Sequence, residues 1–396
     1  MESEKNIVHT LKLTTVTPVA VGANDTSGLS PYTDFFVDEE EGVICLLDQN
    51  RLEKAMEKKP HLVNEFVNGI YDKMDNNQSR FSIRAFIEKN FADIDLFISH
   101  TLPNKGLLSK DRKQLKEVIK TGGRPYLPGS SLKGAIRTAM LYEWLVFTED
   151  GRKTVAKYAN LLLTVTDIEQ LEREVFDETL LFQKLDDATG HLSRHIRVSD
   201  TSVWKKGLYA DNAKRIRLRP SKNKREDPKY RDSAIPQPRE AVFSMQPVTF
   251  SLTINPRFES DKIEYLRADI GEILDVLNAF TIDSLKNELH QLNSDNANHP
   301  QFNHIIDGLE VFYKALLTRA EDDGEIFLRI GSGKTIYDNS LALALINSKL
   351  GELGERALQK LKEHFWDKKA KFSKSPVTRV VSHEGKPFGW IKIEKS

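Results

Sequence analysis

Alternating apolar and polar positions predict several strands and helices in the first part of the chain. The segment HTLKLTTVTPVAVG (9–22) alternates before a proline and a glycine, as a half-buried strand followed by a turn does. GVICLLD (42–48) predicts a second strand. Residues 51–120 are expected to be mostly helical, most clearly at 61–74 and 81–91.

A helix is predicted from residue 132 to residue 147, and RHIRVSDTSV (194–203) predicts a strand after it. The helix follows a turn that contains proline and glycine, and it carries one apolar stripe. The residues of that stripe are Leu132, Ala135, Ile136, Ala139, Met140 and Phe147.

The second part of the chain repeats this mixture of elements. AVFSMQPVTFSLTIN (241–255) predicts a strand, 261–292 and 301–320 predict two helices, and EIFLRI (325–330) predicts another strand. A glycine loop, GSGKT (331–335), follows, and the chain ends in alternating segments.

Strands and helices interleave without a long parallel βαβ series, which favours an α+β fold of small antiparallel sheets covered by helices. The length of 396 residues fits two domains. We expect residues 1–240 to form the first, with a helical insertion and a basic arm. We expect residues 241–396 to form the second, with the glycine loop.

The composition is that of a globular protein, with 29% charged and 39% hydrophobic residues. No apolar run approaches the roughly 18–20 residues of a membrane span, and the first residues do not resemble a signal peptide. The single cysteine, Cys45, excludes an internal disulfide, so we expect it to fill the core of a cytoplasmic protein.

The charge is balanced overall, with 58 basic and 58 acidic residues, but it is unevenly distributed. Residues 191–239 contain 14 Lys and Arg against 5 Asp and Glu, and many of the basic residues lie in 214–231. Such a run is either a solvated or disordered loop or a flexible arm that binds a polyanion.

The stretch RPYLPGSSLKGAIRTAMLYEWL (124–145) places two cations at the start of the predicted helix. The amino end of a helix is already positive, so a cation there is unfavourable unless an anion lies nearby. One serine can cap the helix, which leaves a hydroxyl and backbone N–H groups for a ligand. Lys133 and Arg137 share a face, so the stretch predicts a phosphate site.

The glycine loop 331–335 is a weaker phosphate signal. A nucleotide-binding P-loop would need a glycine at position 328, which is leucine, so the loop does not predict ATPase activity. Contact with a phosphate through the glycine backbone remains open.

Other short motifs carry little chemistry. Ser130-Ser131-Leu132-Lys133 matches a β-lactamase box, but the accompanying boxes are in the wrong order. His191 and His195 lack the glutamate of a zinc motif, and Asp34 is typical of a turn. We therefore predict no metal, no cofactor and no catalytic residue.

PYLPGSSLKGAIRTAML is similar to a signature segment of the RAMP superfamily of CRISPR-associated proteins, and GSGKT stands where that superfamily has its glycine-rich loop. The segments LTTVTPVAVGANDTSGLSPYTDFFVD, IRVSDTS, PREAVFSMQPVTFSLTI and PVTRVV…GKPFGWIKI extend the resemblance over most of the chain. Together they resemble the family of the fifth Csm subunit of type III-A effector complexes.

This resemblance implies two ferredoxin-like (RRM-type) modules and a subunit without its own nuclease centre. It implies binding of the 3′ portion of a crRNA at the end of the filament, beside the backbone RAMP subunit and a small helical subunit, with recruited host nucleases completing maturation. The predicted RNA-binding residues are Gly129, Ser130, Ser131, Lys133, Gly134, Arg137, Arg194, Arg197, Gly331, Ser332, Gly333 and Lys334.

Two other functions stay open at this point. A metal-independent crRNA-processing endoribonuclease would use a histidine as general acid or base, and His9, His191 or His195 are the candidates. An ATP-dependent switch would need tight nucleotide binding by residues 331–335.

Overall fold

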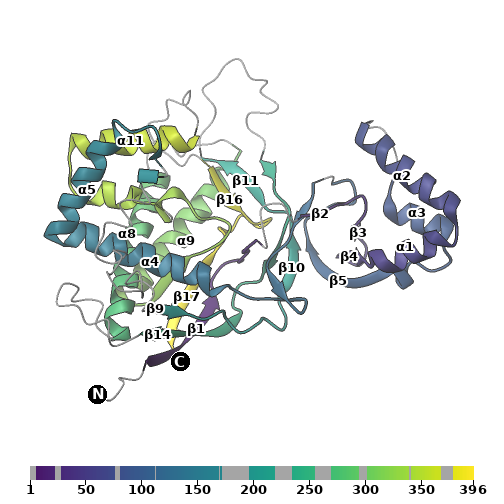
Figure 1. The fold of residues 1–396 in the computed structure, drawn as a ribbon, viewed down its shortest axis with the longest axis horizontal. Coiled ribbons are helices and arrows are strands. Elements are labelled where there is room, and N and C mark those ends of the chain that lie inside the picture. The colour runs from purple at the N-terminus through teal and green to yellow at the C-terminus, as the bar shows by residue number, and fades with distance from the viewer. Residues whose placement is uncertain are drawn as a thin grey trace.

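The computed structural model describes residues 6–22, 28–75, 81–111, 113–168, 170–171, 196–218, 234–254, 269–293, 301–338, 340–366 and 378–396. Its centre is a five-stranded antiparallel sheet of order β15-β17-β1-β14-β9 (Figure 1). The strands are β1 (Ile7–Thr15), β9 (Ile196–Val198), β14 (Pro247–Ile254), β15 (Ile326–Arg329) and β17 (Trp390–Lys395).

Helices cover one face of this sheet. Leu11 and Leu13 of β1 lie in the same apolar core as residues of α4 (Gly129–Phe147) and α8 (Ile270–Asn293). The same core includes residues of α5 (Glu149–Leu162), α10 (Ala342–Asn347) and α11 (Glu352–Trp366). A second core joins the end of α8 to α9 (Asn303–Asp322).

A second sheet of seven strands has the order β2-β6-β13-β10-β5-β4-β3. It pairs antiparallel except for β10 with β5 and β13 with β6. The strands are β2 (Gly28–Leu29), β3 (Phe35–Asp38), β4 (Val43–Leu47), β5 (Ile98–Lys105), β6 (Leu115–Lys116), β10 (Leu208–Asp211) and β13 (Arg239–Val242).

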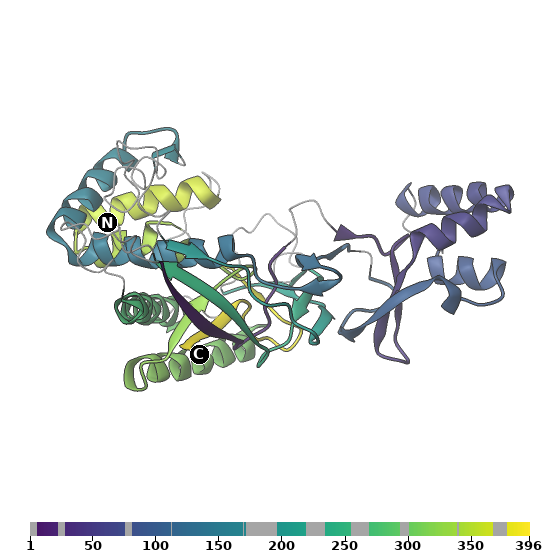
Figure 2. The ribbon, with the colours of Figure 1, turned by 60° about the horizontal axis from the view of Figure 1, so that its bottom comes forward.

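One end of the seven-stranded sheet carries a small helical lobe, which stands away from the rest of the molecule (Figures 1 and 2). Its helices α1 (Gln49–Glu57), α2 (Pro60–Asp75) and α3 (Ile83–Asn90) share a core with β3 and β4. Cys45 is buried in that core, as expected.

Smaller elements complete the described part of the chain. A three-stranded sheet has the order β12-β11-β16, with β11 (Lys214–Arg217), β12 (Ile235–Pro236) and β16 (Thr378–Val381). A hairpin consists of β7 (Lys120–Thr121) and β8 (Arg124–Pro125). Short 3-10 turns lie at Asp95–Phe97 and Ile336–Asp338. Among the described helices, none combines the length and apolar character that a bilayer span requires.

The mixed fold with antiparallel sheets and covering helices confirms the α+β prediction. The expectation of a mostly helical 51–120 is wrong beyond residue 97, because β5 and β6 enter the seven-stranded sheet. The strand expected at 241–255 is divided between β13 and β14, with a turn at Met245 (φ 62°). Phe147 of the predicted apolar stripe is 54% exposed.

The boundary expected at residue 240 does not separate two sheets. The strands β1 and β9 come before it and pair with β14 and β17, which come after it. Strands from residues 1–240 and from residues 241–396 therefore form one common sheet.

A buried ion network joins α8, β15, β16 and the turn at Ile336–Asp338. Glu288 Oε1 lies 3.1 Å from Arg329 Nη1, and Glu288 Oε2 lies 3.0 Å from Arg379 Nε. Asp338 Oδ2 lies 3.3 Å from Arg329 Nη1, and the Tyr313 hydroxyl accepts from Arg329 Nη2. Two buried cations are thus balanced by two buried carboxylates, so losing any one member leaves a charge uncompensated.

We predict that Glu288→Gln lowers the free energy of unfolding by about 3–5 kcal/mol, because it leaves two guanidinium groups with a single carboxylate. Lys286→Ala on the same helix is the matched control. Its pair with Glu321 is exposed, and its removal should cost less than about 1 kcal/mol. Urea denaturation measures both variants, and equal losses would contradict the assignment.

The network also predicts a dependence of stability on pH. Burial acts to raise the pKa of Glu288, but the charges of Arg379 and Arg329 outweigh it and hold that pKa below its usual value. The resulting stability is fully present above the unfolded pKa of about 4.3 and is lost as the pH falls through the folded pKa. Between about pH 5 and pH 3 the wild type should therefore lose more stability than Glu288→Gln.

Candidate nucleic-acid interface

The amino end of α4 is capped by an aspartate that follows the strand β9. The N-cap residue is Pro128, which offers no side-chain hydrogen bond, and Asp200 Oδ1 accepts from the Gly129 N–H at 2.7 Å. The expectation that Ser130 or Ser131 caps this helix is therefore wrong: both lie inside its first turn.

Asp200 reaches the helix because the segment before α4 (residues 125–128) runs beside the segment after β9 (residues 199–204). The Thr201 N–H donates to Leu127 O at 3.0 Å, and Trp204 N–H donates to Pro125 O at 2.9 Å. A Cβ at Gly129 would lie 2.3 Å from Val198 O, so only glycine allows α4 to start this close to β9. The PGSS and RVSD segments thus form one local unit.

The outer face of this corner is polar and cationic. Ser130 and Gly134 are exposed, while Ser131, Lys133 and Arg137 are half-buried. Lys133 and Arg137 also interact within the chain. Asp200 occupies one helix donor, and a hydroxyl and two cations lie close to this helix end, which are groups that phosphate binding uses.

The glycine loop serves the packing of the protein itself. Gly331 has φ +60°, and a Cβ there would lie 2.3 Å from Ala20 O. Gly333 has φ +106°, and its Cβ would lie 2.6 Å from Phe388 O. The Ser332 N–H donates to Ala20 O at 2.8 Å, so this amide is not available to a phosphate.

Lys334 is half-buried, and burial lowers its pKa although Asp338 acts in the opposite direction. The loop therefore does not form the open cradle of backbone amides that the sequence suggested. Contact of these four residues with RNA stays a prediction.

The helix start and the glycine loop each lie at the carboxyl end of a strand of the five-stranded sheet, on the side that we call the sheet edge. The strands β1, β9 and β15 run in one direction, because each pairs antiparallel with β14 or β17. α4 begins beside the end of β9, and the loop follows the end of β15. The two features are not level along the strands: Val198 aligns through β14 with His9 of β1, whereas Leu328 aligns through β17 with Thr15. They are therefore offset by roughly 20 Å along the strands, at about 3.3 Å per residue, in addition to four strand spacings of about 4.8 Å.

Other predicted contacts do not gather at this edge. Arg197 is exposed in β9, and alternation along the strand directs it away from the face that α4 covers. Arg194 and most of the basic arm (residues 219–231) lie outside the described residues. The start of the arm is not a loop, because Lys214–Arg217 is the strand β11.

A histidine that sequence reasoning missed is held by a buried aspartate. His383 Nδ1 lies 3.0 Å from Asp211 Oδ2, and Asp211 also accepts from the His383 N–H and the Tyr209 hydroxyl. No sequence signal indicates this pair, because its members are 172 residues apart. Of the histidines considered from the sequence, His9 is half-buried in β1, and His191 and His195 lie outside the described residues.

Asp34 organises a turn, as the sequence suggested. Its Oδ2 accepts from the Ser30 N–H at 2.7 Å, and its Oδ1 accepts from the Thr33 hydroxyl at 2.9 Å. Within the described part of the chain, no group of three or more His, Cys, Asp or Glu side chains is arranged to hold a metal.

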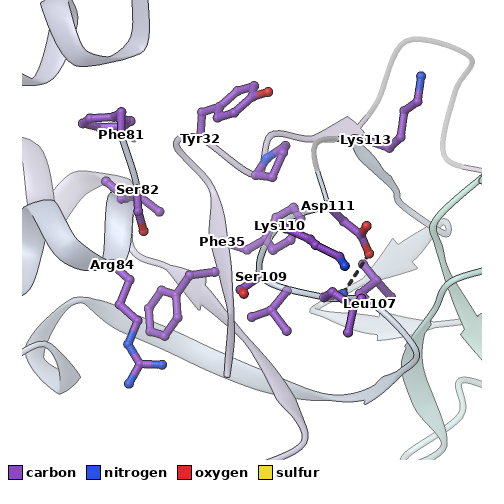
Figure 3. Close-up of a pocket in the computed structure, with 15 residues that line it drawn as sticks. Tyr32, Phe35, Phe81, Ser82, Arg84, Leu107, Ser109, Lys110, Asp111 and Lys113 are labelled. Atoms are coloured by element: carbon purple, nitrogen blue, oxygen red, sulfur yellow. Dashed lines mark hydrogen bonds between the residues drawn. The ribbon is translucent and has the colours of Figure 1, made fainter. Parts of the chain in front are cut away.

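A separate cavity of about 200 Å³ lies in the small lobe (Figure 3). Tyr32, Phe35 and Phe81 give it an aromatic wall, and Lys110 and Lys113 are exposed beside it. Its Arg84 is already paired with carboxylates at 3.2 and 2.9 Å. The cavity lies in the lobe and not at the sheet edge, so it is no part of the candidate interface.

Comparison with known proteins places the chain among CRISPR-associated proteins. The model of the RAMP superfamily matches residues 12–336. A curated relative from Methanocaldococcus jannaschii, "CRISPR system Cms protein Csm5", is 22% identical over 415 aligned positions, covering 98% of this chain and 90% of the relative.

Two solved structures have a similar fold. One is a chain in a cryo-EM Csm–crRNA–target RNA ternary complex of a type III-A CRISPR–Cas system, with a TM-score of 0.66, 21% identity, and coverage of 98% of this chain and 100% of that one. The other is the crystal structure of T. onnurineus Csm5, with a TM-score of 0.61, 21% identity, and coverage of 96% and 99%.

We predict opposite effects on stability from two glycine substitutions in α4. Gly134→Ala should raise the free energy of unfolding by about 0.5–1 kcal/mol, since alanine favours the helix. A Cβ at Gly134 meets no atom within 4 Å. Gly129→Ala should lower it by about 1–3 kcal/mol, because the new methyl group would press on the backbone of β9. Urea denaturation tests both, and a destabilised Gly134→Ala would show that this face is not open.

Proposed function

The chain belongs to the RAMP superfamily, and from this premise we propose that it is a non-catalytic RNA-binding subunit of a type III-A CRISPR (Csm) effector complex. The observation that carries the proposal is the start of α4, where a helix end, the Ser130 hydroxyl and the cations Lys133 and Arg137 lie together. The similarity to a relative named Csm5 supports the choice of subunit.

In its finer form, the proposal assigns this subunit to the 3′ end of the crRNA in the filament. There it would cap the complex beside the backbone RAMP subunit and a small helical subunit, and it would assist crRNA maturation by host nucleases in the cytoplasm. A chain of similar fold in a Csm–crRNA–target RNA complex supports crRNA and Csm subunits as partners.

We also infer a ferredoxin-like module in the five-stranded sheet. Its part β17-β1-β14-β9 has the order fourth, first, third, second, with α4 before β9 and α8 after β14. On this view, β15 is an added edge strand, and the small lobe is an insertion between β1 and α4. A second such module stays a prediction.

The position of Lys133 and Arg137 at the start of α4 predicts how RNA binding responds to mutation and salt. Lys133→Ala and Arg137→Ala should each weaken binding of labelled single-stranded RNA about equally for unrelated sequences, because they contact phosphates and not bases. Each should also reduce the slope of log K against log salt by about 0.7. Fluorescence anisotropy at several salt concentrations measures both.

Lys58→Ala is the matched control, because Lys58 is exposed at the end of α1 in the small lobe. It should leave affinity and slope unchanged. Affinity and slope at the wild-type values in both α4 variants would refute the proposed interface. Purification of the chain from its own cells should bring down small RNAs of uniform 5′ end together with other RAMP proteins.

The pair of Asp211 and His383 favours one alternative, a metal-independent endoribonuclease. A histidine oriented through Nδ1 could take the proton of a 2′-hydroxyl, whose oxygen would attack the adjacent phosphorus and form a 2′,3′-cyclic phosphate. The P–O5′ bond would break, and the 5′-oxygen would take a proton from water. Under the non-catalytic proposal, labelled repeat RNA stays intact with purified protein and EDTA. Discrete cleavage that disappears in His383→Ala would establish the alternative instead.

A further inference from the structure

One row of side chains crosses the seven-stranded sheet with an excess of positive charge. Pairing places Lys116 of β6 opposite Arg239 of β13, Arg239 opposite Asp211 of β10, and Asp211 opposite Lys105 of β5. Directly paired residues of neighbouring strands project from the same face. The row therefore has three cations and one acid.

Arg239 is a buried cation without an ion pair in the described part of the chain. Its side chain is 6% exposed, stacks over Phe388 at 5.5 Å, and donates to Gln237 O at 3.2 Å and Gln237 Oε1 at 2.9 Å. The neighbouring Asp211 carboxylate is occupied by His383 and Tyr209. A buried charge that lacks a counter-ion is energetically costly, so an anion bound beside Arg239 would stabilise the protein.

The electrostatics of Arg239 agree with this description. Burial lowers the pKa of Arg239 to about 10, with Asp211 opposing the change and the nearby Arg215 adding to it. The guanidinium remains charged at neutral pH. Because its pKa is lowered, the surroundings of Arg239 stabilise the positive charge less well than water does.

A cavity of about 230 Å³ opens beside this cation. Lys116 and Arg239 form one wall, and Ala20, Gly331 and Ser332 of the sheet edge form another. Glu117 and Glu240 also line it, and both pair with Lys120, at 3.1 and 2.9 Å. Because both carboxylates pair with Lys120, Lys116 and Arg239 are the two lining charges without an ion pair in the described part of the chain.

We propose that this cavity binds one phosphate group of a single-stranded RNA backbone between Arg239 and Lys116. The assignment rests on the proposed function and adds a subsite to it. A guanidinium can hold two phosphate oxygens, and the ammonium of Lys116 can approach a third from the rim. Gly331 has no side chain to obstruct this wall, so the phosphate would connect the glycine loop to the cationic row.

The test uses the full chain, Arg239→Met and Lys116→Ala, with labelled single-stranded RNA. Methionine keeps the apolar contact with Phe388 and removes the buried charge, so the fold should survive. We expect each variant to bind RNA about tenfold more weakly, with a salt slope reduced by about 0.7. Lys116 is exposed, so its variant tests the site even if Arg239→Met fails to fold.

A second measurement is independent of RNA. Added inorganic phosphate should raise the Tm of the wild type more than that of Arg239→Met. Equal shifts in the two proteins would overturn the assignment.

The outcomes separate the subsite from the proposed function. Wild-type affinity in Arg239→Met and Lys116→Ala, together with weakened Lys133→Ala, would overturn the subsite and leave the proposed function standing. Absence of RNA binding by the wild type would overturn the proposed function. A phosphate shift of Tm that is lost in Arg239→Met would then still support an anion site.

Discussion

The backbone that leaves β1 is the constraint on which the rest of the structure depends. Val19 exchanges two hydrogen bonds with Val242, at 3.0 and 2.8 Å, which attaches the seven-stranded sheet. Pro18 O accepts from the Gly389 N–H, and Ala20 O accepts from the Ser332 N–H, both at 2.8 Å. One short extended segment therefore fixes the two sheets, the glycine loop and the C-terminal strand relative to one another.

This arrangement explains why glycines concentrate where segments meet. Gly129, Gly331 and Gly333 each stand where a Cβ would press on a carbonyl oxygen of another segment. These glycines allow two backbone segments to pack closely together. If they also contact a phosphate, they do so on a surface that this packing forms. Gly134 differs because a Cβ there would meet no protein atom within 4 Å, so this glycine is not required for packing within the protein.

Two buried arginines differ in what surrounds their charge: one stabilises the fold through ion pairs, and the other is the proposed ligand-binding residue. Arg329 lies among carboxylates within ion-pair distance and stabilises the junction of α8 with β15. Arg239 is equally hidden from water, but an amide and an aromatic ring are its partners. A neutral net charge hides this difference, because the balance of 58 basic and 58 acidic residues is not kept at each site.

The sequence by itself determined the main elements, because local periodicity fixes which face of a strand or helix is apolar. β1, α4, α9 and β17 lie where alternation or helical spacing predicted them, and the signature at Gly129 identified the family. Only the tertiary structure decided the partners. Asp200 capping α4, β17 beside β1, and Asp211 beside His383 and Arg239 join residues far apart in the chain, and a single sequence has no local pattern that records such contacts.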